Sequence, residues 1–137
     1  MGVPMPTSRA SRPVAIAMAF LVLFVGLALR RWAGGAFAKY AGVALYGALI
    51  YTLVIAIAPR LSPWRAAAIV LGFCWAIEFG QLSSIPASLA KRSMLARLVL
   101  GTTFNLPDLF GYVAGIAPVA AADGGLRARD RANRECH

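Results

Sequence analysis

Long apolar runs alternate with short polar segments along this chain, and the alternation is the first guide to its architecture. Four runs can be distinguished, over about residues 14–32, 37–58, 66–84 and 104–122. Each has close to the ~20 residues that an α-helix needs to cross the hydrocarbon core of a bilayer. Proline, glycine and basic residues separate the runs, as is usual where helices end. The pattern therefore predicts an all-α integral membrane bundle of four transmembrane helices.

The segment between the third and fourth runs has a different pattern. Leu95, Leu98 and Val99 have the i, i+3, i+4 spacing of one helical face, and basic residues occupy other positions around them. The segment is too short and too basic to cross a bilayer. We expect an amphipathic or re-entrant helix over about residues 88–100, lying at the membrane surface between spans three and four.

The first apolar run allows a second interpretation, as a signal peptide. The triplet Ala36-Phe37-Ala38 has the small residues of a cleavage site. Arg30 and Arg31 stand between the run and this triplet, which argues against cleavage and favours a retained helix. We therefore divide the chain into three parts: a polar lead (residues 1–13), a four-helix transmembrane domain (14–122) and a charged tail (123–137).

Composition agrees with a membrane location. The chain is 60% hydrophobic and 14% charged, with a mean hydropathy of +0.70, whereas soluble domains are about 45–50% apolar and about 25% charged. The net charge of +9 raises the question of nucleic acid. The basic residues lie at the ends of the apolar runs, where membrane proteins contact lipid headgroups. We therefore expect a membrane lipid as partner and no nucleic acid, with a homo-oligomer or a membrane-protein partner left open.

The distribution of the 14 basic residues predicts an orientation. Eight lie on the side that would hold both termini and the polar turn at residues 59–65, and six lie on the other side. Cytoplasmic loops carry an excess of Lys and Arg. The count predicts that both termini are cytoplasmic.

The inventory of reactive residues is small. The chain has one His and two Cys, so it lacks a metal-ligand cluster of the usual spacing. A Ser–His or Cys–His pairing of the kind used in nucleophilic catalysis is also missing. We expect no metal, no cofactor and no catalytic residue, although enzymatic activity is left open.

Glu78 is the most informative residue, because a carboxylate inside an apolar run costs at least ~2.5–3.5 kcal/mol unless it is paired or protonated. Cys74, Glu78 and Gln81 share one face of the third predicted helix. Small residues form a stripe on roughly the opposite face, where a neighbouring backbone could approach closely: Gly72, Ala76 and Gly80. We expect protein on both faces of this helix, with Glu78 turned inward.

The fourth predicted helix also places an acid beside small residues. Asp108, Gly111, Tyr112 and Gly115 share one face, and Gly111 with Gly115 has the GxxxG spacing of close helix packing. Asp108 has a simpler interpretation as well, because an acid in the first turn of a helix interacts favourably with the helix dipole.

We expect the polar residues near this end to form a pocket: Glu78, Gln81, Arg92, Arg97, Asp108 and Tyr112. The planar donor fork of arginine matches phosphate, so two acids, two arginines and a tyrosine would suit a zwitterionic or phosphate-bearing headgroup. Two neighbouring carboxylates could also perform acid–base chemistry. The alternative is a buried ion pair in which Glu78 locks the third helix to the amphipathic segment.

The order and spacing of these residues resemble the DUF2809 group of small bacterial membrane proteins. The resemblance covers roughly residues 14–120 and rests on the following motifs: Ile77-Glu78-Phe79 with Gln81, then Arg92, then Leu100-Gly101 with Phe104, Asp108-Leu109, Tyr112 and Gly115. That group is similar in turn to the VanZ-like proteins, which usually carry an Asn where this chain has Tyr112. The resemblance implies an integral protein of a bacterial inner membrane and implies no particular chemistry.

Three functions remain open from the sequence. The first, which we favour, is a non-enzymatic protein of the cell envelope that binds a lipid or amphiphile headgroup in the polar pocket. The second is a structural or assembly subunit whose polar residues fix helix packing. The third is an intramembrane enzyme or proton-coupled transporter that uses Glu78 and Asp108.

Overall fold

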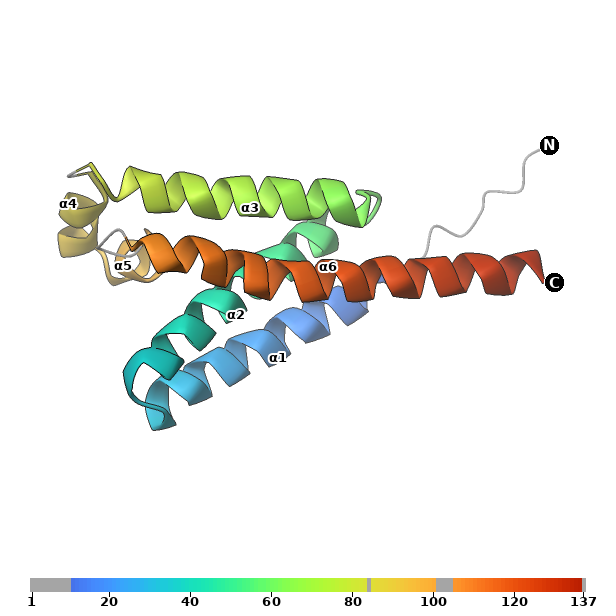
Figure 1. Ribbon diagram of the computed structural model, residues 1–137, viewed down its shortest axis with the longest axis horizontal. Helices are drawn as coiled ribbons and strands as arrows, with labels where there is room; N and C mark the ends of the chain where they lie inside the picture. Colours follow the sequence, from blue (N-terminus) through green and yellow to red (C-terminus); the bar gives the residue numbers. More distant parts are fainter. Residues whose placement is uncertain (1–10, 84, 101–104, 137) are drawn as a thin grey trace.

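The computed structural model describes residues 11–83, 85–100 and 105–136. Most of the predicted polar lead, together with Gly101 and Phe104, lies outside these residues, as do the side chains of Leu98 and Val99. The described part contains helices and no strand, which confirms the all-α prediction. Six helices follow one another (Figure 1): α1 (Ser11–Trp32), α2 (Gly35–Ile57), α3 (Pro63–Gly80), α4 (Ile85–Arg92), α5 (Met94–Leu100) and α6 (Leu106–Glu135).

Three of these helices are long and apolar enough to cross a membrane. They are α1, through its stretch Arg12–Leu29, and the whole of α2 and of α6. Helix α3 is not among them, because Arg65 and Glu78 lower the mean hydropathy of its 18 residues. Four spans were expected, and the structure supports three of them by the length and composition of the helices.

The ends of the helices follow from local chemistry. Gly35 has a φ of +76°, a left-handed conformation that glycine adopts without strain, and it allows the tight connection between α1 and α2. Ser62 caps the start of α3 by accepting a hydrogen bond at 3.4 Å from the backbone N–H of Arg65. Pro63 occupies the first turn of α3, where its missing N–H costs nothing.

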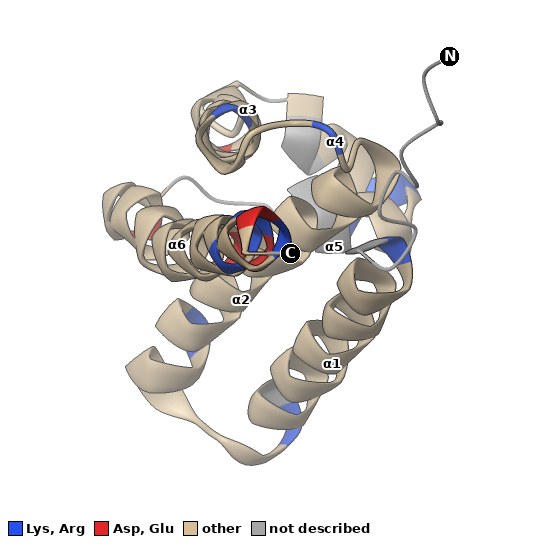
Figure 2. Cartoon of the chain, turned by 90° about the vertical axis from the view of Figure 1, so that its right-hand side faces the viewer, with Lys and Arg blue, Asp and Glu red and all other residues tan. Residues whose placement is uncertain are grey.

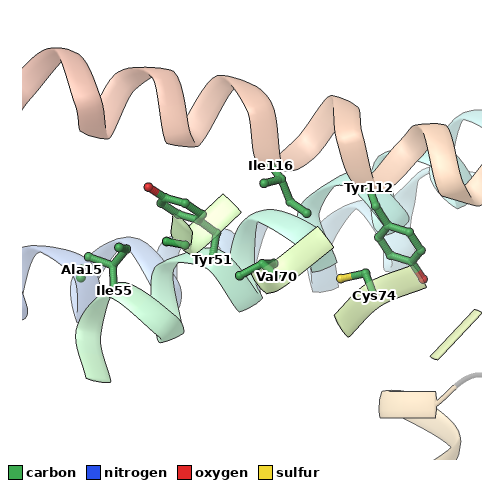
Figure 3. Packing of buried hydrophobic residues seen from close by; sticks show 8 residues of the cluster. Ala15, Tyr51, Ile55, Val70, Cys74, Tyr112 and Ile116 are labelled. Carbon is green, nitrogen blue, oxygen red and sulfur yellow. The ribbon is translucent and has the colours of Figure 1, made fainter. Parts of the chain in front are cut away.

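Helix α2 is the centre of the arrangement, because it packs against α1, α3 and α6, while α6 also runs along α3 (Figure 1). The core lies between α2, α3 and α6 (Figure 3). Its main residues come from all three helices: Tyr51 and Ile55, Val70 and Cys74, Tyr112 and Ile116. The α1–α2 connection and helices α4 and α5 lie toward one end of the molecule, and the C-terminal end of α6 lies toward the other (Figure 1).

Helices α2 and α6 approach most closely at glycines. A Cβ atom built on Gly115 would overlap the carbonyl oxygen of Ala44, and one on Gly111 would lie 2.9 Å from Cγ1 of Val43. The GxxxG spacing of α6 therefore lies where the backbone of α2 passes, which is the packing that small residues permit.

The stripe of small residues on α3 lies in a different environment. Gly72 and Ala76 are exposed on α3, and a Cβ on Gly72 or Gly80 would meet no atom of another described element within 4 Å. The buried residues of α3 form one stripe on the other side: Ala66, Val70, Cys74 and Glu78. The expectation of protein on both faces of this helix is therefore not met within the described residues of one chain.

Two further boundaries differ from the sequence-based prediction. The amphipathic segment forms two short helices, because α4 ends before Ser93 and Ser93 Oγ then accepts from the N–H of Ala96 at 3.4 Å at the start of α5. The predicted boundary at residue 122 is absent, since α6 continues to Glu135. An i, i+4 ion pair between Asp123 and Arg127 supports the helix across this point.

Candidate functional site

Glu78 lies in the last turn of α3 and is 1% exposed. Its Oε1 accepts a hydrogen bond of 2.7 Å from the backbone N–H of Asn105, and its Oε2 accepts one of 3.4 Å from the hydroxyl of Tyr112. Both partners belong to the start of α6 or the residue before it. The carboxylate is therefore turned into the protein.

The bond to Asn105 completes the start of another helix. Asn105 is the N-cap of α6, and the first N–H groups of a helix have no partner within the helix. In a capping box, a side chain three residues later accepts the N–H of the N-cap. That later residue here is Asp108, and it accepts from the side-chain amide of Asn105 instead. Glu78 supplies the missing acceptor from α3.

The charges around Glu78 come from several helices. Asp108, which is 8% exposed, acts repulsively on Glu78, and Lys39 on α2 acts attractively. The start of α6 adds the positive end of its dipole, which favours nearby carboxylates. Glu78 therefore lies beside a second acid, with the start of α6 as its main source of favourable interaction.

The structure brings three of the six predicted pocket residues together. Glu78, Asp108 and Tyr112 lie at the interface of α3 and α6. Arg92 and Arg97 are exposed on α4 and α5, and no ion pair joins either of them to a carboxylate among the described residues. An exposed guanidinium keeps its hydration, whereas a buried pair with Glu78 would lose it.

The remaining predicted residue, Gln81, follows directly after α3. It is half-buried, and its backbone N–H bonds the carbonyls of Ile77 and Glu78 at 3.1 and 3.2 Å. Its position as C-cap of α3 places it at the same end of the helix as Glu78.

A second connection between α3 and α6 lies beside Glu78. The indole N–H of Trp75 donates to the backbone carbonyl of Leu109 at 3.3 Å. No sequence pattern points to this bond, because a backbone carbonyl inside a helix carries no sequence signature as an acceptor.

A second polar cluster, which the sequence analysis missed, consists of Tyr51, Asp123 and Arg127. Tyr51 is 1% exposed and donates from its hydroxyl to Asp123 at 2.7 Å. Asp123 also accepts from Nε of Arg127 at 2.8 Å, and Nη1 of Arg127 donates to the carbonyl of Leu61 at 2.7 Å. This cluster attaches α6 to α2 and to the turn that follows α2. The i, i+4 spacing of Asp123 and Arg127 was an available signal.

Arg12, near the other end of the chain, forms hydrogen bonds to the end of α2, next to the loop that Arg127 contacts. Its Nε donates to the carbonyl of Ala56 at 3.1 Å, and its Nη2 donates to that of Ile57 at 3.4 Å. Both carbonyls belong to the last turn of α2, whose acceptors have no partner within the helix. A cationic side chain at this position also interacts favourably with the negative end of the helix dipole.

Metal coordination has no candidate in residues 11–83, 85–100 and 105–136. No group of three or more His, Cys, Asp or Glu side chains there is close enough to hold an ion. The acids of the first cluster instead bond backbone and side-chain donors of α6.

The fold and these clusters define an all-helical protein with three helices able to cross a membrane. Residues 32–116, more than half of the 137, match the model of a family described as "Protein of unknown function (DUF2809)". The chain belongs to the DUF2809 family, as the order of its motifs suggested. The matched region contains Glu78, Asn105, Asp108 and Tyr112 but ends before Asp123 and Arg127. No solved structure matches the chain.

Proposed function

We propose that the chain is a four-span protein of the bacterial inner membrane with both termini in the cytoplasm. We further propose that α4 and α5 bind the phosphate-bearing headgroup of a lipid or other amphiphile without catalysing a reaction. Under this proposal, the cluster of Glu78, Asp108 and Tyr112 positions the binding surface.

Helix α3 is the fourth span in this proposal. At 1.5 Å per residue, its 18 residues give a length of about 27 Å, close to the ~30 Å of the hydrocarbon core. It lies along α6, which is a candidate span itself. Its outward face is apolar, with Ile69, Phe73 and Phe79 exposed, and its acid is buried. These features suit a helix in lipid.

The positions of the connections support an even number of spans. The α1–α2 connection lies at the same end as α4 and α5, and the C-terminal end of α6 lies at the opposite end (Figure 1). The end that holds the termini would carry eight of the 14 basic residues. This excess supports a cytoplasmic location of both termini.

The observation that carries the binding proposal is the exposed and unpaired state of the arginines on α4 and α5. Arg92 and Arg97 are in ion-pair contact with no carboxylate of the described chain. Large apolar side chains are exposed on the same two helices: Ile85, Leu89, Met94 and Leu95. Basic amphipathic helices of this kind lie in the membrane interface and attract anionic headgroups, and arginine bonds phosphate through two parallel donors.

The bond between Glu78 and Asn105 positions this surface. Helices α4 and α5 lie between the end of α3 and the start of α6, and the bond holds these two points together at 2.7 Å. The bond therefore fixes the distance between the two ends of the segment that carries the binding surface. Glu78 acts through Asn105 and does not contact the headgroup.

The experiment uses the full chain in nanodiscs that contain phosphatidylcholine and phosphatidylglycerol. Native mass spectrometry would count the phosphatidylglycerol molecules that remain bound to the wild type and to Arg92→Gln/Arg97→Gln. The matched control is Arg129→Gln/Arg131→Gln, which removes the same charge from exposed positions of α6. We expect loss of bound lipid in the first variant alone. Equal retention in both variants would refute the proposal.

The second candidate function, a structural or assembly subunit, is favoured by the internal bonds of Glu78. Both carboxylate oxygens of Glu78 accept hydrogen bonds from α6 or its cap. This candidate predicts that Arg92→Gln/Arg97→Gln has no effect on lipid binding, whereas Glu78→Ala lowers stability and any cellular phenotype together.

A further inference from the structure

The turn between α2 and α3 carries a basic and aromatic surface at the end of the molecule opposite α4 and α5. Trp64, in the first turn of α3, is 85% exposed. Arg60 and Arg65 are exposed on either side of it. Because α2 is a candidate span that ends at Ile57, this surface stands where the hydrocarbon core gives way to the headgroups. Tryptophan is enriched at that depth of the membrane.

The positive charge of this surface is not neutralised by the chain. Asp123 is the acid attached to the turn through Arg127, and it is already bonded by Arg127 and Tyr51. Among the side chains that the structure describes, no carboxylate forms an ion pair with Arg60 or Arg65. Figure 2 looks at this end and shows basic residues on α3 and on α6.

The neighbouring arginines have other partners. Arg12 donates to the last carbonyls of α2, and Arg127 donates to Asp123 and to Leu61. The two guanidinium groups that remain available at the turn therefore belong to Arg60 and Arg65, with Trp64 between them. Two arginines beside an interfacial tryptophan match the phosphate groups of an anionic leaflet in charge and in depth.

We propose that Arg60, Trp64 and Arg65 form a second lipid-contact surface that binds the phosphate groups of anionic phospholipids in the leaflet at this end. The indole ring of Trp64 lies at the level of the glycerol groups, and the two guanidinium groups bond phosphates beside it. This surface is independent of the headgroup binding proposed for α4 and α5, since it lies at the other end and shares no residue with it.

The test measures the affinity of the full chain for phosphatidylglycerol in nanodiscs, as the retention of this lipid in native mass spectrometry while its share of a phosphatidylcholine bilayer is varied. The variant is Arg60→Gln/Arg65→Gln, and the control is Arg129→Gln/Arg131→Gln. We expect the variant to lose affinity for phosphatidylglycerol by about thirtyfold, because each of the two basic residues near an anionic surface contributes about 1 kcal/mol and every 1.4 kcal/mol is tenfold. The control removes the same charge from α6 at the same end of the molecule, away from Trp64, and should lose clearly less affinity than the variant. Equal affinity of the variant and the wild type would overturn the proposal.

A second measurement, the quenching of Trp64 fluorescence, tests the depth of this residue in the membrane. Its fluorescence is obtained as the difference between the wild type and Trp64→Phe, which leaves Trp75 and its bond to Leu109 in place. We expect quenching by lipids brominated close to the glycerol group and little quenching by lipids brominated at the chain ends. Quenching by neither lipid would overturn the proposal. A change of oligomeric state in Arg60→Gln/Arg65→Gln, with unchanged lipid affinity, would assign the surface to a second copy and would also overturn it.

Discussion

Glu78 and Asn105 are separated by 27 positions in the chain and are joined by a hydrogen bond of 2.7 Å, in which the end of α3 accepts from the cap of α6. An acid that could have faced an arginine is instead the acceptor for a backbone amide. Such a bond depends on the oxygen of Glu78 more than on its charge. The distinction can be tested by two substitutions at the same position.

Glu78→Ala removes the acceptor, whereas Glu78→Gln keeps a carbonyl oxygen for Asn105 and an amide that can donate to the oxygen of Tyr112. A buried polar group left without a partner costs about 1–3 kcal/mol. We expect Glu78→Ala to lower the free energy of unfolding by about this amount and Glu78→Gln to lower it much less. Unfolding by SDS titration from mild detergent micelles would measure both. Equal losses would show that the charge of Glu78 is what matters.

Gly115→Ala should separate α2 from α6. The added methyl group would overlap the carbonyl oxygen of Ala44, which is backbone and cannot rotate away. Overpacking of this kind costs about 1–3 kcal/mol, and the same SDS titration would detect it. Gly72→Ala is the control, because the space beside Gly72 is open and alanine favours a helix. A stable Gly115→Ala variant would contradict the close approach of the two backbones.

Tyr51→Phe removes the hydroxyl that donates a hydrogen bond to Asp123 and keeps the aromatic ring in the core. Hydrogen bonds to charged groups contribute about 1.5–3 kcal/mol, so we expect a measurable fall in thermal stability. Tyr40→Phe provides the matched control, since Tyr40 is exposed on α2. An unchanged melting temperature in Tyr51→Phe would mean that the second cluster does not hold α6 to α2.

The four-span proposal can be tested by labelling cysteines from one side of the membrane. Cys136 is exposed, whereas Cys74 is buried. We expect an impermeant maleimide to label a Ser88→Cys variant in intact spheroplasts at the added cysteine on α4, and to label Cys136 only after permeabilisation. Labelling of Cys136 in intact spheroplasts, with the cysteine of Ser88→Cys protected until permeabilisation, would support three spans with α3 outside the hydrocarbon.

The helices were predictable because apolar runs of about 20 residues leave a signal that single substitutions do not erase. The ends were less predictable. The break at Ser93 is accompanied by one side-chain bond to Ala96, and the pair of Asp123 and Arg127 supports the extension of α6 beyond residue 122. Hydropathy does not register either feature.

The site was predictable in its acids and in Tyr112, and not in the backbone partner of Glu78. Glu78 stood out because of its charge, and arginines were the natural partners to expect from composition. Its short bond is to the backbone N–H of Asn105, and every residue except proline carries such a group. A sequence pattern therefore could not single it out.

The two stripes of small residues show the same limit. Gly111 with Gly115 and Gly72 with Gly80 are both consistent with close helix packing. Only the first pair meets a neighbouring helix within the described chain. The spacing predicts that a backbone could approach, and the tertiary arrangement decides where one does.

The loop between α2 and α3 has an unusual constraint for a surface connection. Loops generally accept inserted residues. Here the carbonyl of Ala56, just before the loop, accepts a hydrogen bond from Arg12, and the carbonyl of Leu61, near the end of the loop, accepts one from Arg127. The two arginines come from opposite ends of the chain. One extra residue would shift Leu61 relative to Ala56, and one of the two guanidinium groups would lose its acceptor. Length changes during evolution should therefore be tolerated at the connection between α1 and α2 and be selected against here.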